Sequence, residues 1–208
     1  SFHSETHIKR LVSSIEKKYP IIVIENSLNV DLKNELEKKY NHVEVIIPPK
    51  NIGISAGYNL GIKRSKTNYV KLTSPDINLS NKSLEDMEEC ATKIKDFAIL
   101  GPTYDDNNIY KNYAIWNPEK VTDNFTNDTF EKFSIKEVDF IENDFIINKK
   151  DFTDLGFFDE NIFLYYETMD LCKKARAANK KIYVCQKKLL LTTMDILKGM
   201  TFLLGRLM

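Results

Sequence analysis

The sequence has no excess of either charge, few cysteines and no long uninterrupted hydrophobic run. Its 30 basic and 30 acidic residues cancel, so no net field attracts nucleic acid, and we expect a small-molecule partner. A secretion signal would show as a charged segment followed by an apolar run, and the given sequence shows no such pattern. The three cysteines match no metal or redox spacing, which favours reduced thiols in a cytoplasmic protein: Cys90, Cys172 and Cys185.

The last 20 residues are mostly apolar but are interrupted by Asp195, Lys198 and Arg206. This stretch is too broken to predict a membrane span. We therefore expect one domain over residues 1–186, followed by an apolar helical segment over 187–208. A helix packed on the domain and a helix lying on the inner face of the membrane are both open, so peripheral membrane contact is one alternative.

Helical and strand-like patterns alternate along the chain, whose 208 residues suit one domain. Helices are expected at 6–19, 31–40, 56–65, 83–94 and 168–178, and strands at 21–24, 43–47, 69–73, 97–100, 138–147 and 181–185. Between them, 104–134 has no sustained period and is interpreted as a long irregular excursion. The alternation predicts an α/β fold with a mostly parallel central sheet flanked by helices.

Polar residues follow several of the predicted strands. The chain opens with a helix, so we expect a strand to be missing before Ser1. With that strand in place, three polar segments would line one crevice at the strand ends, where ligands of such sheets bind: Ser1-Phe2-His3, Glu25-Asn26-Ser27 and Ser74-Pro75-Asp76.

A glycine-rich segment, Asn51–Gly61, follows one predicted strand and opens a helix. Glycines permit close backbone approach, and a helix N-terminus offers N–H groups to an anionic ligand. The glycine spacing differs from the dinucleotide-binding fingerprint, which disfavours a nicotinamide-dependent oxidoreductase, and the Lys-Ser/Thr ending of a P-loop is absent. A turn that simply requires small residues is the structural alternative.

This segment resembles the N-x-G-x-x-x-G-x-N-x-G signature of family 2 glycosyltransferases, in particular those that add rhamnose or related sugars to bacterial surface polysaccharides. Other blocks agree in order. Ser1–Glu5 resembles T-Y-N-x-E, and Ile22–Ser27 resembles V-V-D-N-x-S. Leu72–Asp76 resembles the L-N-P-D form of the metal-binding D-x-D motif, while two later blocks resemble G-G-F-D-E and F-L-Y-x-E-D-x-D-L-C: Gly156–Glu160 and Phe163–Cys172.

The resemblance implies a GT-A fold and an inverting transfer of a sugar from a UDP-, dTDP- or GDP-linked donor to a glycan or lipid-linked acceptor, assisted by Mg²⁺ or Mn²⁺. It implies that Asp76 ligates the metal, that Glu167 is the general base with Asp170 in reserve, and that Asp159 and Glu160 shape the acceptor side. The residues implied to bind the nucleotide sugar are Phe2, Glu25, Asn51, Gly53, Gly57, Asn59 and Asp76. For Asn51 and Asn59, fixing the loop and touching the nucleotide are equally open.

The sequence departs from the family pattern at four places. Ser74 replaces the first acid of D-x-D, which leaves the second metal ligand open, with Asn78 as a candidate. Thr168 replaces the acid after Glu167, and no histidine follows His42. Asn143-Asp144 stands where relatives often have Gly-Ala or Gly-Ser, which alters the floor of the sugar or acceptor pocket. A non-catalytic nucleotide- or glycan-binding domain with the same fold is therefore the alternative function.

Overall fold

The computed structural model describes residues 1–94, 96–103, 113–115, 133–187 and 200–204. Its helices are α1 (Glu5–Ser14), α2 (Val30–Lys39), α3 (Gly53–Arg64), α4 (Asn81–Ile94), α5 (Lys149–Asp154) and α6 (Glu167–Ala177). Its strands are β1 (Ile21–Ile24), β2 (Val43–Ile46), β3 (Tyr69–Thr73), β4 (Ile99–Pro102), β5 (Tyr113–Ala114), β6 (Phe133–Glu137), β7 (Phe140–Ile141), β8 (Phe145–Asn148), β9 (Ile182–Lys187) and β10 (Met200–Leu204). The predicted irregular excursion lies largely outside the described residues.

Eight strands form one central sheet in the order β2-β1-β10-β3-β8-β4-β9-β6. The strands β2, β1, β10 and β3 run parallel, as do β4 and β9. β8 is antiparallel to both β3 and β4, and β6 is antiparallel to β9. The α/β class with a helix-flanked central sheet is confirmed, and the sheet is mixed because β8 enters between two strands of the opposite direction.

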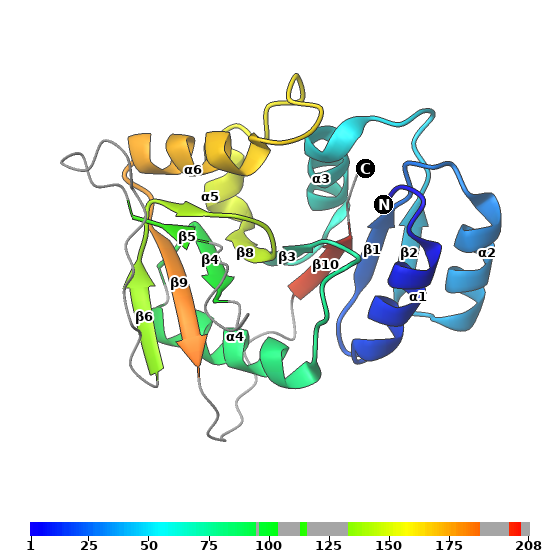
Figure 1. Cartoon of the computed structure of the whole chain (residues 1–208), viewed down its shortest axis with the longest axis horizontal. Coiled ribbons are helices and arrows are strands. Elements are labelled where there is room, and N and C mark those ends of the chain that lie inside the picture. The colour runs from blue at the N-terminus through cyan, green and yellow to red at the C-terminus, as the bar shows by residue number, and fades with distance from the viewer. Residues whose placement is uncertain (95, 104–112, 116–132, 188–199, 205–208) are drawn as a thin grey trace.

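Successive side chains of a strand point to opposite faces of the sheet, and this alternation builds two cores. Ile21 and Val23 of β1 join the apolar residues of α1, α2 and α4, whereas Ile22 and Ile24 join those of α3, α5 and α6. Figure 1 shows α3, α5 and α6 along one side of the sheet and α1 and α4 along the other. The molecule thus has three layers, and the C-terminal ends of β1 and β3 meet at one edge.

The C-terminal segment differs from its prediction. Within 187–208, Lys187 ends β9 and the described residues 200–204 form the strand β10, whereas a helix was expected. It lies parallel between β1 and β3, where Phe202 pairs with Ile21 on one side and Lys71 on the other (Figure 1). Parallel pairing on both sides satisfies the backbone polar groups of an apolar run, which a helical pattern in the sequence cannot reveal.

The single strand predicted over 138–147 is interrupted in the structure. β7 and β8 flank a turn in which Asn143 and Asp144 both have positive φ, 52° and 48°. Asparagine and aspartate tolerate this left-handed conformation better than most residues, and no strand passes through it. The turn brings Glu142 and Asn143 to the edge of the sheet.

The cysteines also depart from expectation. Cys90 of α4 and Cys185 of β9 are joined by a disulfide with their Cα atoms 6.4 Å apart. Their separation of 95 residues hid the fact that α4 packs on β9. The prediction of three reduced thiols is therefore wrong for this pair, while Cys172 is free and buried. None of the helices in the described ranges has the length and apolar character needed to cross a bilayer.

Candidate functional site

A cavity of about 590 Å³ opens beyond the C-terminal end of β3. Three segments far apart in the sequence supply its walls: the turn after β3, the turn between β7 and β8, and the loop that leads into α6. The lining residues are Ile54, Ser74, Asp76, Ile77, Phe140, Glu142, Asn143, Leu164, Tyr165, Tyr166, Glu167, Thr168 and Met169. Of the residues predicted to act at the site, the cavity brings together Asp76 and Glu167.

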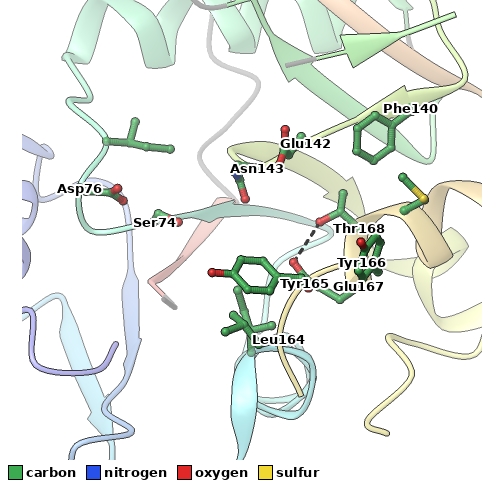
Figure 2. A pocket seen from close by; sticks show the side chains of 13 residues that line it. Ser74, Asp76, Phe140, Glu142, Asn143, Leu164, Tyr165, Tyr166, Glu167 and Thr168 are labelled. Carbon is green, nitrogen blue, oxygen red and sulfur yellow. Dashed lines mark hydrogen bonds between the residues drawn. The ribbon is translucent and has the colours of Figure 1, made fainter. Parts of the chain in front are cut away.

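Asp76 lies in the turn that follows β3. The backbone N–H of Ile77 donates to the carbonyl oxygen of Ser74 at 3.2 Å, which closes this turn. Arg10 of α1 donates from Nη2 to the carbonyl oxygen of Asp76, also at 3.2 Å. These contacts fix the backbone, and the exposed Asp76 side chain is left at one end of the cavity (Figure 2).

Glu167 is the first residue of α6 and lines the same cavity, apart from Asp76 and beside Thr168 (Figure 2). It is 7% exposed, and its Oε1 accepts a hydrogen bond from the Thr168 hydroxyl at 3.4 Å. Its Oε2 is buried without a hydrogen-bond partner among the described residues. Burial raises the pKa of Glu167, and the charge of Glu142 adds to the rise. A raised pKa makes this carboxylate a stronger proton acceptor.

Asp170, the reserve base, does not line the cavity. It lies in the first turn of α6, where the Lys174 ammonium pairs with its Oδ2 at 2.7 Å. Such an i,i+4 pair and an acid in the first turn both stabilise a helix. The structure therefore gives Asp170 a place in the helix and Glu167 the place in the cavity.

The glycine-rich segment holds the loop that leads into α6. Gly53 has φ +83°, and a Cβ atom there would lie 2.8 Å from the carbonyl oxygen of Phe163. That same oxygen accepts a hydrogen bond from the backbone N–H of Ile54 at 2.9 Å. At Gly57 a Cβ would lie 3.6 Å from the side chain of Ile24, an ordinary contact. Of these two glycines, Gly53 is thus the one that close approach requires.

The two asparagines of this segment make loop contacts. Asn51 Oδ1 accepts from the N–H of Gly53 at 3.1 Å. Asn59 is 1% exposed, donates to the Phe158 carbonyl and accepts from the Phe158 N–H, both at 3.0 Å. Asn59 also donates to Glu160 Oε1 at 2.9 Å. Of the two roles left open by the sequence, the loop-fixing role is the one the structure displays.

Four other predicted site residues lie outside the cavity lining. Glu25 is fully buried; its carboxylate accepts from the hydroxyls of Ser1 and Ser27 and, at 2.8 Å, from the Ser27 N–H. The remaining three are Asp159 and Glu160 in the loop before α6, and Phe2 near the N-terminus. Asp159 accepts from Asn161 at 2.9 Å, Glu160 bonds Asn59, and the half-buried Phe2 packs on the α3 side of the sheet.

Several cavity residues were not singled out from the sequence. Glu142 lay inside a predicted strand, and its exposure to the cavity depends on the turn that splits that strand. Tyr165 and Tyr166 have φ of 65° and 66° and are 68% and 73% exposed, so the loop turns their rings outward. Their place in the block F-L-Y-Y-E was a signal that could have been followed.

The described residues of the cavity lining include three carboxylates and no lysine or arginine: Asp76, Glu142 and Glu167. In the described part of the chain, no three His, Cys, Asp or Glu side chains are grouped closely enough to hold a metal ion alone.

No family model matches the chain. In sequence it is similar to the low-salt glycan biosynthesis hexosyltransferase Agl10 of Haloferax volcanii, with 26% identity over 204 residues. The match covers 89% of this chain and 62% of Agl10. The chain thus spans less than two thirds of that relative.

Several solved structures resemble the chain in fold at low sequence identity. A structure of GalNAc-T7 with UDP, GalNAc and Mn²⁺ has a TM-score of 0.64 and 13% identity, over 85% of this chain and 39% of that one. S. aureus TarS 1–349 has a TM-score of 0.65 and 14% identity, over 90% and 58%. The mannosyltransferase PcManGT from Pyrobaculum calidifontis, in complex with GDP-Man and Mn²⁺, has a TM-score of 0.65 and 8% identity, over 90% and 54%.

The chain has the GT-A fold. This confirms the fold implied by the sequence motifs; the sequence relative is a hexosyltransferase and one of the structural neighbours is a mannosyltransferase.

Proposed function

We propose that this chain is the donor-binding catalytic domain of an inverting glycosyltransferase of the family 2 type. It transfers a hexosyl or rhamnosyl residue from a UDP-, dTDP- or GDP-linked donor to a hydroxyl of a glycan or lipid-linked acceptor. The observation that carries the proposal is that Asp76 and Glu167, far apart in the sequence, line one cavity at separate places (Figure 2).

This placement suits a single displacement. Inversion requires a base on the side of the sugar opposite to the leaving diphosphate. A diphosphate at the Asp76 end puts the sugar in the middle of the cavity and leaves Glu167 facing the acceptor hydroxyl. The raised pKa of Glu167 favours its taking the proton of that hydroxyl, because the stronger base gains more from the transfer.

The residues present fit a divalent metal ion. Carboxylate oxygens such as those of Asp76 are the ligands that Mg²⁺ and Mn²⁺ prefer, and such ions commonly share one or two carboxylates with substrate phosphates. When bound, the metal would supply electrostatic stabilisation of the departing diphosphate. Asp76 would hold it, and Ser74 beside it offers a neutral hydroxyl where the D-x-D pattern has an acid.

Exposed aromatic side chains support a binding place for the acceptor beside Glu167. Tyr165 and Tyr166 line the cavity, and Phe163, 52% exposed, and Met169, 51% exposed, lie in the same loop and the first turn of α6. Tyrosine rings offer a flat apolar face with a polar tip, which suits a sugar ring that is apolar on its faces and polar at its edge. We place the acceptor on this rim, next to Glu167.

The test is turnover. Incubation with UDP-, dTDP- and GDP-sugars, Mn²⁺ and an acceptor extract should release nucleotide diphosphate, and EDTA should stop the release. Asp76→Asn should lose it as well, whereas Asp154→Asn, at an exposed position of α5 outside the cavity lining, should keep it. Indifference of the rate to both EDTA and Asp76→Asn would remove the metal role. Nucleotide binding without release from any donor would instead assign the chain to non-catalytic binding.

A further inference from the structure

Among the described residues, one ion pair is almost completely shielded from water. Lys71 Nζ of β3 lies 2.7 Å from Asp144 Oδ1, and the two side chains are 1% and 2% exposed. Val70 and Leu72 belong to the core on the α3 side, so Lys71 points to the opposite face, beside Ile146 of β8. Burial lowers the pKa of Lys71, and Asp144 opposes that shift.

Such a pair is costly to keep. Desolvating two charges consumes most of their mutual attraction, and apolar side chains in their place are often as stable or more stable. The backbone adds a second cost, because Asn143 and Asp144 are consecutive non-glycine residues with positive φ. Asparagine and aspartate suit the left-handed turn, but stability alone does not explain why a charged pair, Lys71 and Asp144, is kept in the interior.

The position of the turn between β3 and the cavity indicates a role for the buried ion pair. Asp144 anchors the turn to β3, the strand whose end carries Ser74 and Asp76. Glu142 and Asn143, directly before the anchor, both line the cavity. Figure 2 shows them on the side across from Tyr165, in the stretch of the cavity between Asp76 and Glu167. On the proposed function, the transferred sugar lies at this place.

We propose that the Lys71–Asp144 ion pair is a positioning device that holds the Glu142–Asn143 turn as the wall of the donor-sugar subsite, and that the Asn143 side chain hydrogen-bonds a hydroxyl of the transferred sugar. This inference rests on the proposed function. It assigns recognition of the sugar to the turn and leaves the nucleotide diphosphate to the Asp76 end.

The test compares the affinity for a nucleotide sugar with that for its nucleotide diphosphate, measured by calorimetry with Mn²⁺. UDP-glucose, UDP-N-acetylglucosamine, dTDP-rhamnose and GDP-mannose serve as probes for wild type. In Lys71→Met/Asp144→Asn both charges are gone and the left-handed turn is still tolerated. We expect the advantage of the sugar nucleotide over the diphosphate to fall roughly tenfold, with the diphosphate affinity unchanged.

Asn143→Gly keeps the turn and the ion pair but removes the side chain, and the same loss is expected. The matched control is Lys180→Met/Asp151→Asn, which removes an ion pair of 2.5 Å outside the cavity lining; its ratio should equal that of wild type. An unchanged ratio in Asn143→Gly overturns the inference, even if the Lys71 variant fails to fold. An equal weakening of sugar nucleotide and diphosphate also overturns it.

Failure of the proposed function gives a different result. If wild type binds no nucleotide diphosphate, the donor site itself is wrong, and the inference falls with it. If wild type binds the diphosphate but gains no affinity from any of the four sugars, the nucleotide assignment stands and only the sugar wall is overturned.

Discussion

Replacing Gly53 by alanine should destabilise the protein in two separable ways. The first cost is conformational, because φ at Gly53 is +83° and a residue with a Cβ pays about 1–2 kcal/mol there. The second is steric, since the new Cβ would lie 2.8 Å from the Phe163 carbonyl oxygen and 3.2 Å from its Cα. Forcing backbone apart in a packed region costs about 1–3 kcal/mol, so the total loss is about 2–5 kcal/mol.

Gly156→Ala isolates the conformational cost. Gly156 has the same φ of +83°, and nothing lies within 4 Å of an added Cβ. We therefore expect Gly156→Ala to lose about 1–2 kcal/mol only. Urea denaturation of the two variants gives the difference, which is the steric term.

The steric clash at Phe163 should also disturb the cavity. Phe163 is displaced in Gly53→Ala, and the loop that follows it carries Tyr165, Tyr166 and Glu167 into the cavity. We expect kcat/KM to fall in Gly53→Ala by far more than in Gly156→Ala. Equal destabilisation of the two variants, or full activity in Gly53→Ala, would refute the reasoning.

Two further changes test the buried polar groups. Asn59→Ala leaves the N–H and carbonyl of Phe158 unpaired and should cost about 2–3 kcal/mol in urea denaturation, whereas the exposed Asn161→Ala should change little. Glu167→Gln should abolish transfer yet stabilise the fold. The pKa of Glu167 is raised on folding, so the native state holds its proton longer and stability is lost as pH rises through the unfolded and then the folded pKa. The Tm of Glu167→Gln should equal that of wild type at about pH 4 and exceed it by the full amount at about pH 8. A wild type that is more stable than Glu167→Gln at pH 8 would contradict this. The same shift places the acid limb of the wild-type pH–rate profile above 4.5, the ordinary value for Glu, and a limb at or below it would exclude Glu167 as base.

Local sequence patterns predicted the helices and strands whose residues carry a clear apolar period or run. β1 and β3 coincide with their predictions, because continuous apolar runs bounded by polar residues have few alternatives in an α/β domain. The polar strand end at Ser74–Asp76 followed from the same signal, and the helix predicted over 168–178 begins one residue earlier, at Glu167. The rule that strand ends gather at one sheet edge predicted a crevice lined by Ser74–Asp76, Glu25–Ser27 and Ser1–His3. Ser74 and Asp76 line the cavity, whereas Glu25 is buried outside its lining, and Glu167 was assigned from the family resemblance.

The features that the sequence missed depend on long-range contacts. β10 takes its place from hydrogen bonds to β1 and β3, more than 100 residues away in the sequence, and no local pattern reports them. The turn at Asn143 and Asp144 depends on a lysine in another strand. Asn51 and Asn59 have the same residue type whether they hold a loop or a ligand, so only coordinates separate the two.

The central claim is that Asp76 and Glu167 face one cavity in which a cation-bridged diphosphate binds. A crystal structure of the chain soaked with UDP or GDP and Mn²⁺, with anomalous data at the manganese edge, tests it most directly. The account predicts a manganese peak at bonding distance from the Asp76 carboxylate, with the diphosphate between that ion and the Glu142–Asn143 turn. A nucleotide bound on another face, or manganese remote from Asp76, would contradict it.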